Sequence, residues 1–311
     1  MYLGIDIGSV SIKYSVIDKD YNVVEYDYIR TNGDIVNATK KILSKIKTKK
    51  IKSVITTGSA RNFIKELINA DMDIDEITAH RKAISKLYPK VKTIFEIGGQ
   101  DSKLIYFGDK FANFEMNNVC AAGTGSFLDQ QASRLSLSIE DFCKKGLEAK
   151  KSHTIASKCT VFAESDMING QQSGVPINEI IRGVHKGMIN NYFSSLCKGK
   201  KLSGDFLFEG GTSLNPVLVE ELANKLIQEG YINNKSELIV PKPYNTVIGS
   251  IGAAIIGLEK DIKNLRSIPK IENFKFIENS ECFNCSNKCG AKITKVEINN
   301  KNITIGKTCQ M

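Results

Sequence analysis

The sequence lacks three features that would place the protein in a membrane, outside the cell or on nucleic acid. No apolar run reaches the roughly 18 residues that a membrane-spanning helix needs. The amino terminus, Met1 to Asp6, begins directly with a strand-like pattern and has no signal peptide. The basic residues are not interleaved with aromatic residues as in a nucleic-acid platform. We therefore expect a cytoplasmic protein with neither a membrane nor a nucleic acid as partner.

The composition fits a globular protein of about two domains. The chain has 311 residues, of which 41% are hydrophobic, enough to build a real core. The formal net charge of +9 comes mainly from lysines spread along the chain, which indicates a solvated lysine surface; an acidic protein partner is a further option. Eight cysteines in a cytoplasmic protein favour metal binding or redox chemistry over disulfides.

Two of the cysteines, Cys120 and Cys159, stand in similar settings, each shortly before a predicted helix. A thiolate at a helix amino terminus lies near free N–H groups and the positive end of the dipole, which also suits an anionic metal–sulfur cluster. An iron–sulfur cluster usually takes four thiolates, so a second chain would have to supply two. The stretch therefore suggests a homodimer with one metal centre on its axis. On spacing alone, two buried core cysteines are the simpler interpretation.

A first glycine turn follows the first predicted strand and carries groups suited to phosphate. Gly8, Ser9 and Val10 form the turn, in which Gly8 permits close approach of a phosphate and Ser9 offers a hydroxyl and an N–H group. Asp6 can hold Mg²⁺ through water, and Lys13 can reach back as a cation. An ordinary glycine hairpin would have the same pattern.

A second turn repeats this arrangement after the strand that ends at Ile97. Its residues are Gly98, Gly99, Gln100, Asp101 and Ser102, followed by Lys103. Gln100 and Asp101 are candidates to position a water molecule or the metal. Two such turns in one chain favour a polyphosphate held from two sides over two unrelated hairpins.

A third glycine motif suits an adenosine pocket. Gly210 and Gly211 follow a predicted strand and permit a ligand to lie against the backbone. Thr212 comes next, and Asn215 can cap a helix that has Pro216 at its first position.

Apolar periodicity predicts the remaining elements. Strands are expected over residues 2–7, 11–18, 21–30, 51–56, 91–97 and 205–208, and a further strand is expected after Lys103, running through residue 107. Helices are expected over residues 34–47, 62–69, 73–87, 126–132, 161–169, 177–198, 217–228 and 247–258. The helix over 73–87 carries His80, for which we expect a structural or solvated role.

Together these motifs resemble those of a known family. Asp6 to Ser9, Gly98 to Lys103 and Glu209 to Gly211 are similar to the two phosphate motifs and the adenosine motif of the acetate and sugar kinase, Hsp70 and actin superfamily. With the residues around Cys120 and Cys159, the chain closely resembles the ATPase activators of 2-hydroxyacyl-CoA dehydratases, over roughly residues 1–260.

The resemblance implies an α/β fold of two ribonuclease-H-like domains, a homodimer and an ATP/ADP and Mg²⁺ site. It also implies one [4Fe–4S] cluster per dimer, held by Cys120 and Cys159 of each chain. ATP hydrolysis would then drive a low-potential electron to a partner iron–sulfur dehydratase or reductase, with a ferredoxin or flavodoxin as donor. One departure is local, since residues 57–61 read Thr-Gly-Ser-Ala-Arg where the family has Thr-Gly-Tyr-Gly-Arg.

The larger departure is a cysteine-rich carboxy-terminal tail. Its spacing C-x2-C-x3-C-x19-C supplies four soft ligands that suit Zn²⁺ or a second [4Fe–4S] cluster: Cys282, Cys285, Cys289 and Cys309. A hairpin is expected over 293–305. Cys143 and Cys197 lack such neighbours and are expected to be core or surface thiols.

We expect a first domain over residues 1–90, completed by about 245–262. A second domain is expected over 91–244 and a linker with the tail over 263–311. Two other functions use the same fold. A small-molecule kinase of the amino-sugar type would need a general-base Asp, for which the sequence offers no candidate, and it leaves Cys120 and Cys159 unexplained. A nucleotide-dependent regulatory scaffold with a zinc tail would contain no iron.

Overall fold

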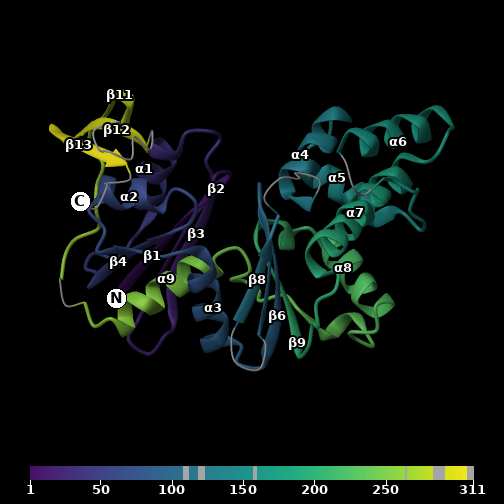
Figure 1. Cartoon of the computed structure of the whole chain (residues 1–311), viewed down its shortest axis with the longest axis horizontal. Helices are drawn as coiled ribbons and strands as arrows, with labels where there is room; N and C mark the ends of the chain where they lie inside the picture. Colours follow the sequence, from purple (N-terminus) through teal and green to yellow (C-terminus); the bar gives the residue numbers. More distant parts are fainter. Residues whose placement is uncertain (108–111, 118–122, 157–159, 263–264, 283–290, 307–311) are drawn as a thin grey trace. The chain divides into compact units, whose positions relative to one another are not determined.

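The structure is a computed structural model that describes the chain except residues 108–111, 118–122, 157–159, 263–264, 283–290 and 307–311 (Figure 1). The chain divides into two compact units. Unit 1 comprises Met1–Ala83 and Gly249–Met311, and unit 2 comprises Ile84–Ile248. The sequence-based domain limits near residues 90 and 244 remain a prediction.

Unit 1 contains a five-stranded sheet in the order β3-β2-β1-β4-β5. The central strand β1 pairs antiparallel with β2 and parallel with β4. The strands are β1 (Tyr2–Ile7), β2 (Ser11–Ile17), β3 (Val23–Arg30), β4 (Ser53–Thr57) and β5 (Met72–Asp73). The strand predictions for β1 to β4 are confirmed, and each predicted boundary lies within two residues of the observed one.

Helices cover both faces of this sheet. Leu3, Ile5 and Ile7 of β1 face the core that the sheet shares with α1 (Ile35–Lys45) and α2 (Arg61–Ile68). The alternate residue Gly4 faces α9 (Ile248–Glu259), because a Cβ there would lie 1.9 Å from the Ser250 carbonyl oxygen. Helix α3 (Glu76–Leu87) packs in turn on α9.

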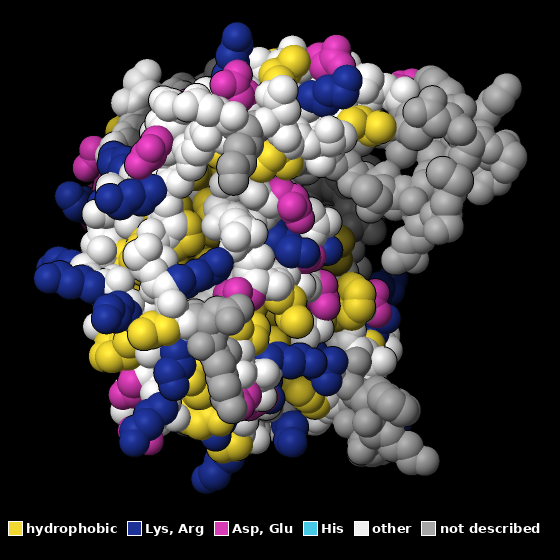
Figure 2. All heavy atoms as spheres, turned by 90° about the vertical axis from the view of Figure 1, so that its left-hand side faces the viewer, with side chains coloured by type: hydrophobic (Ala, Val, Ile, Leu, Met, Phe, Trp, Pro, Cys, Tyr) yellow, Lys and Arg dark blue, Asp and Glu magenta, His cyan; other side chains and the backbone are white. Residues whose placement is uncertain are grey.

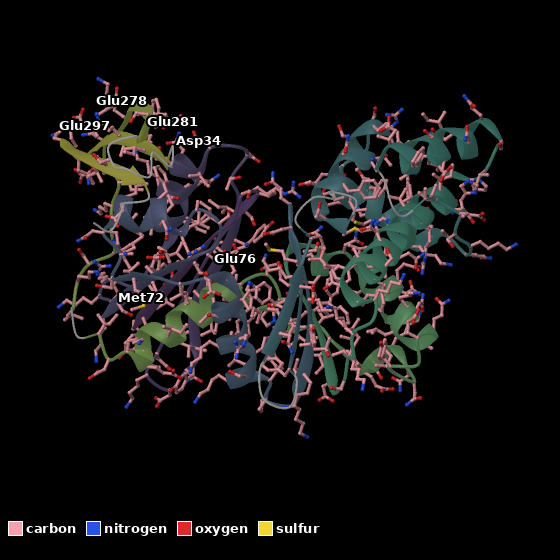
Figure 3. All side chains as sticks on the ribbon, in the orientation of Figure 1. Asp34, Met72, Glu76, Glu278, Glu281 and Glu297 are labelled. Carbon is pink, nitrogen blue, oxygen red and sulfur yellow. The ribbon has the colours of Figure 1, made fainter. Side chains whose placement is uncertain are left out.

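The observed cap of α1 confirms its predicted start. The Asp34 carboxylate, labelled in Figure 3, accepts a hydrogen bond from the Asn37 N–H (3.0 Å). This satisfies one of the free donors at the first turn of the helix.

Unit 2 contains a second sheet with the same topology, in the order β8-β7-β6-β9-β10. Its central strand β6 also pairs antiparallel with the next strand and parallel with a later one, β9. The strands are β6 (Val91–Ile97), β7 (Ser102–Phe107), β8 (Ala112–Met116), β9 (Asp205–Glu209) and β10 (Leu238–Ile239). The repeat of one sheet plan agrees with the expected two ribonuclease-H-like domains.

The helices of unit 2 share one apolar core with its sheet. They are α4 (Gly125–Arg134), α5 (Ile139–Glu148), α6 (Thr160–Gln172), α7 (Ile177–Tyr192) and α8 (Pro216–Gln228). Helix α7 is mostly buried and continues as a single π-helical turn, η2 (Phe193–Cys197), so the long helix expected over 177–198 is confirmed with a change of pitch.

The chain ends in a three-stranded antiparallel sheet of β11 (Phe274–Cys282), β12 (Ala291–Ile298) and β13 (Lys301–Gly306). The β12–β13 hairpin confirms the one expected over 293–305, and its turn residues Asn299 and Asn300 both have positive φ. Val296 and Ile298 of β12 are buried in the core of unit 1. Strand β11 was not predicted.

On the face that Figure 2 shows, charged side chains are dispersed rather than gathered in one block. Figure 2 shows Lys and Arg interspersed with Asp and Glu on one face. Figure 3 shows Glu278, Glu281 and Glu297 on the carboxy-terminal sheet. No helix in the described part of the chain combines the length and apolarity that crossing a bilayer requires.

The contact between α9 and α3 predicts an intolerant glycine. A Cβ at Gly252 would lie 1.8 Å from the Ala79 carbonyl oxygen, so Gly252→Ala must push two helices apart. We expect it to lower the free energy of unfolding by about 1–3 kcal/mol, the usual effect of overpacking. Urea unfolding followed by circular dichroism measures this.

Gly187→Ala in α7 is the matched control, because its Cβ would meet the Ile155 carbonyl oxygen at an ordinary 3.4 Å. Alanine also favours a helix over glycine by up to about 1 kcal/mol. The control should be neutral or stabilising. An equal loss in both variants would contradict the packing argument.

Candidate nucleotide site

The first glycine turn joins β1 to β2 and brings a carboxylate and an ammonium together. The Gly8 N–H donates to the Ser11 carbonyl oxygen (2.9 Å), which closes the turn. Asp6 and Lys13 face each other across the hairpin, and Lys13 Nζ lies 3.1 Å from Asp6 Oδ2. Asp6 is 5% exposed, so its charge is balanced within a nearly dry site.

Asp6 also lies at the amino-terminal end of α9. A Cβ at Gly249, the second residue of that helix, would lie 2.8 Å from Asp6 Oδ2 and 3.1 Å from His80 Nε2. The carboxylate of Asp6 thus lies near the positive end of the helix dipole. His80 is buried rather than solvated and converges on the same point as Asp6, a neighbourhood that its helix sequence did not reveal.

The end of β4 adds a buried hydroxyl beside Asp6. Thr57 pairs with Asp6 in the sheet register, and its Oγ1 is buried without a hydrogen-bond partner in the part of the chain that the structure describes. A polar atom in this state fits a site that takes a phosphate or hydrated metal ion.

The local departure at residues 57–61 has a structural reason. Gly58 has φ of +97° and lies against Ile7. Ala60, by contrast, has φ of −101°, which any residue adopts, so glycine is not needed at that position.

The second turn, between β6 and β7, is built in the same way. The Gly98 N–H donates to the Asp101 carbonyl oxygen (2.9 Å), as Gly8 does to Ser11. Lys103 Nζ lies 3.1 Å from Glu96 Oε2 and 3.1 Å from Asp101 Oδ2. Glu96 is the counterpart of Asp6 and was missed, although it stands seven residues before Lys103, as Asp6 does before Lys13.

The other predicted residues of this turn differ in their surroundings. Gln100 is exposed. The Ser102 side chain is fully buried and donates to the Gly123 carbonyl oxygen (2.6 Å). The carbonyl oxygens of Gly98 and Gly99 accept from the Gly125 N–H (2.9 Å) and the Ser126 N–H (2.7 Å) at the start of α4. The turn is therefore bonded to the amino terminus of a helix.

The adenosine motif follows β9 and depends on one conformationally special residue. Gly210 has φ of +93°, and a Cβ there would lie 2.5 Å from the Ile97 carbonyl oxygen. That same oxygen accepts a hydrogen bond from Thr212 Oγ1 (2.8 Å). The motif thus lies directly against the end of β6, and its Gly211 opens the short helix η3 (Gly211–Leu214).

Asn215 is bonded to both α7 and α8. Its Oδ1 accepts from the Val217 N–H (3.0 Å), which confirms the predicted cap of α8. Its Nδ2 lies 2.9 Å from Nε2 of His185, a fully buried residue of α7 whose Nδ1 lies 2.8 Å from the Ile181 carbonyl oxygen. Burial lowers the pKa of His185 to about 4, so the ring is neutral at pH 7, with Nδ1 donating and Nε2 accepting.

The predicted metal ligands lie outside the described residues. This holds for Cys120, Cys159, Cys285, Cys289 and Cys309, while β11 ends at Cys282. The segments that the structure does describe hold no group of three or more His, Cys, Asp or Glu placed to bind a metal ion. Cys143 is half-buried and Cys197 is buried, in line with the core or surface thiols expected. Burial raises the pKa of the Cys143 thiol to about 11 and that of Cys197 to about 12, so both stay protonated at pH 7.

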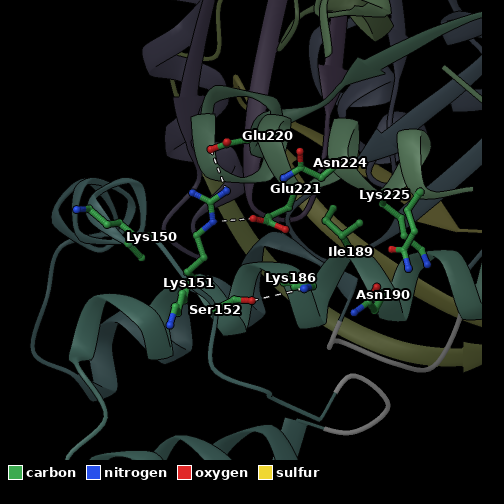
Figure 4. A pocket seen from close by; sticks show the side chains of 13 residues that line it. Lys150, Lys151, Ser152, Lys186, Ile189, Asn190, Glu220, Glu221, Asn224 and Lys225 are labelled. Carbon is green, nitrogen blue, oxygen red and sulfur yellow. Dashed lines mark hydrogen bonds and ion pairs between the residues drawn. The ribbon is translucent and has the colours of Figure 1, made fainter. Parts of the chain in front are cut away.

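A separate cavity of about 350 Å³ lies at the end of α5, beside α7 and α8 (Figure 4). Its lining is rich in basic side chains: Lys150, Lys151, Arg182, Lys186 and Lys225. Arg182 pairs with Glu220 (2.9 Å) and Glu221 (2.6 Å) of α8, so it joins two helices. None of the glycine turns contributes to this cavity.

The chain matches the model of one protein family, the BadF/BadG/BcrA/BcrD ATPase family, over residues 3–257. The protein belongs to this family. The match contains all three glycine motifs together with Cys120 and Cys159, and it ends before β11. The predicted ATPase and the predicted resemblance are thereby confirmed.

Individual relatives agree. The activator of lactoyl-CoA dehydratase from Anaerotignum propionicum is 34% identical over 267 residues, which covers 83% of this chain and 97% of the relative. The crystal structure of component A of the (R)-2-hydroxyglutaryl-CoA dehydratase from Acidaminococcus fermentans is 29% identical with a TM-score of 0.73, covering 83% of this chain and 98% of that one.

A second solved structure contains a nucleotide. The activator of the 2-hydroxyisocaproyl-CoA dehydratase from Clostridium difficile, with bound ADPNP, is 29% identical with a TM-score of 0.72. The likeness covers 86% of this chain and all of that one. The predicted fold of the acetate and sugar kinase, Hsp70 and actin superfamily is confirmed by these neighbours.

The neutral state of His185 predicts a pH dependence. The folded protein holds this ring deprotonated down to about pH 4, whereas the unfolded chain takes up the proton near its ordinary pKa of 6.5. Stability should therefore fall as the pH falls from 6.5 to 4, by about 3 kcal/mol at most from this group.

His185→Gln lacks the titrating ring, so its thermal midpoint should fall less than that of the wild type over this range. Between pH 7 and 8 both states are neutral at this position, and the two slopes should agree. Parallel curves below pH 6.5 would show that His185 is protonated in the folded protein.

Proposed function

We propose that the protein is an ATP-dependent activator of a partner iron–sulfur enzyme. It couples MgATP hydrolysis to transfer of a low-potential electron from a [4Fe–4S] cluster that bridges a homodimer. The observation that carries the proposal is the family match. One continuous match contains the two turns with their ion pairs, Asp6–Lys13 and Glu96–Lys103, together with Cys120 and Cys159. A plain kinase of the same fold has no use for that cysteine pair.

The nucleotide contacts follow from the two turns and the adenosine motif. Gly8, Ser9 and Val10 of the first turn, with Gly98 and Gly99 of the second, present backbone to the phosphates. Lys13 supplies positive charge. The buried Asp6 holds Mg²⁺ through water, beside the unpartnered hydroxyl of Thr57.

Two further groups complete this part of the proposal. Gly210, Gly211 and Thr212 lie against the adenosine. Asp101, whose side chain is 42% exposed beside Lys103, and the exposed Gln100 orient the attacking water. Ser102 and Asn215 act through the backbone that their side chains hold.

Cys120 and Cys159 of each chain are the proposed cluster ligands. Helix α6 begins at Thr160, the residue after Cys159 in the sequence, and α4 begins at Gly125, five residues after Cys120. The positive end of a helix dipole stabilises thiolates and an anionic cluster, and at α4 this dipole is the contribution that counts because the Gly125 and Ser126 N–H groups already bond to the second turn. When bound, the cluster supplies the electron.

The partners are proposed from the same relationship. A ferredoxin or flavodoxin would donate the electron, and an iron–sulfur dehydratase of 2-hydroxyacyl-CoA, or an enzyme of the benzoyl-CoA reductase or double-cluster type, would accept it. The tail cysteines Cys282, Cys285, Cys289 and Cys309 would hold Zn²⁺ or a second cluster.

Metal content tests the cluster. Protein purified without oxygen should contain about four irons per dimer in excess of any tail iron, and Cys120→Ala and Cys159→Ala should each lose them. Cys143→Ala and Cys197→Ala serve as controls and should keep them. Iron that survives the first two variants, or about one zinc per chain, identifies the tail metal. An iron-free wild type, even after reconstitution, would rule out electron transfer.

Asp6→Asn tests the nucleotide site. The variant keeps the shape of the side chain but removes the charge that faces Lys13 and the metal, so ATP hydrolysis should fall about 100-fold or more. Asp20→Asn, at an exposed turn, should hydrolyse ATP at the wild-type rate. If Asp6→Asn remained fully active, another group would have to hold the metal ion.

A further inference from the structure

Ser102 is hydrogen-bonded to the residues on both sides of segment 118–122. Its N–H donates to Asn117 Oδ1 (2.7 Å), and its carbonyl oxygen accepts from the Asn117 N–H (3.1 Å). Its hydroxyl donates to the Gly123 carbonyl oxygen (2.6 Å). Ser102, at the end of the second glycine turn, is therefore bonded to Asn117 and Gly123, the residues that precede and follow the segment containing Cys120.

The turn is attached to the returning chain at two more points. The carbonyl oxygens of Gly98 and Gly99 accept the Gly125 and Ser126 N–H groups at the start of α4. The approach is close, because a Cβ at Gly125 would lie 3.2 Å from the Gly98 oxygen and 3.1 Å from Thr212 Cγ2 of the adenosine motif. The backbone at Gly125 therefore lies directly against both the second turn and the adenosine motif.

The first turn shows that the turn itself does not need this hydroxyl. Ser102 pairs with Ile97 at the start of its hairpin, and the corresponding residue of the first hairpin is Ile12, paired with Ile7. Ile12 lies in the apolar core of unit 1. The two hairpins have the same closing bond and the same carboxylate–lysine pair, so Ser102 differs in what it attaches to the turn.

We propose that Ser102 and Asn117 are positioning residues that join the second phosphate turn to the Cys120 segment. This inference rests on the proposed function, in which the turn contacts the nucleotide and Cys120 is a cluster ligand. Because these hydrogen bonds fix Asn117 and Gly123 to Ser102, a shift of the turn on nucleotide exchange is passed on to the residues that flank the segment.

Asn117 is a better residue to vary than Ser102, because Ser102 belongs to the proposed phosphate turn and Asn117 is not among the proposed nucleotide contacts. Asn117→Ala removes the acceptor of the Ser102 N–H, whereas Asn117→Asp keeps an oxygen at that position. Asn113→Ala, at an exposed asparagine of β8, is the matched control. The readout is the rate at which iodoacetamide alkylates Cys120, quantified by mass spectrometry. Full-length protein is purified without oxygen and freed of iron with a chelator that is then removed, because a cluster-bound thiolate would be protected. The rate is measured with ADP or with a non-hydrolysable ATP analogue and Mg²⁺.

In the wild type, Asn113→Ala and Asn117→Asp, the rate should differ between the two nucleotides by about fivefold or more, the scale of ordinary coupling between sites. In Asn117→Ala the two alkylation rates should be equal. Asn117→Asp should keep the wild-type KM for MgATP and the wild-type thermal midpoint. A wild-type response in Asn117→Ala, or no response in the wild type, would overturn the proposal. The alkylation rate does not depend on bound iron. A wild-type protein that contains no iron would therefore refute the proposed function, while the alkylation rates would still test the junction between the turn and the Cys120 segment.

Discussion

Each unit depends on a buried carboxylate held against a lysine across the mouth of a β-hairpin. Removing one charge of such a pair would leave the other without compensation in a nearly dry site, at a cost of several kcal/mol. The pair therefore keeps a polar, charged turn at the end of a central strand, where the surroundings are otherwise apolar. The glycines Gly58 and Gly210 complete each turn by lying on the last residue of that strand.

Most of the fold could be predicted because its strands and helices carry strong periodic patterns. Most of the elements that were missed lack them. β5 has two residues, and β8 is an edge strand with exposed Phe114 and Met116, so neither shows an apolar face. Helix α5 was missed although its Ser138 cap and its amphipathic spacing are present in the sequence. Strand β11 was not predicted; it begins where the expected connection ends, and its residues are largely exposed.

The glycine turns of the site could also be predicted, because glycine, Asp and Lys at fixed spacing have a direct chemical meaning. The partners of Ser102 and Asn215 could not, because Gly123 and His185 lie 21 and 30 residues away in the sequence. The cap that Asn215 provides to α8 was predicted, whereas its contact with His185 and the bond from Ser102 to Gly123 were not. Only the internal repeat carried a usable signal, since aligning Asp6 with Glu96 would have revealed the second carboxylate.

Part of the apolar core of unit 1 is supplied by the carboxy-terminal sheet, which lies outside the region that matches the family model. Val296 and Ile298 complete the core under α1 and α2, and Phe63 of α2 meets Phe274 of β11 edge-on, with ring centroids 6.3 Å apart. A metal ion bound by the tail cysteines would favour the folded sheet by mass action, and with it the core beneath. The stability of unit 1, which contains Asp6, would then vary with the metal supply of the cell.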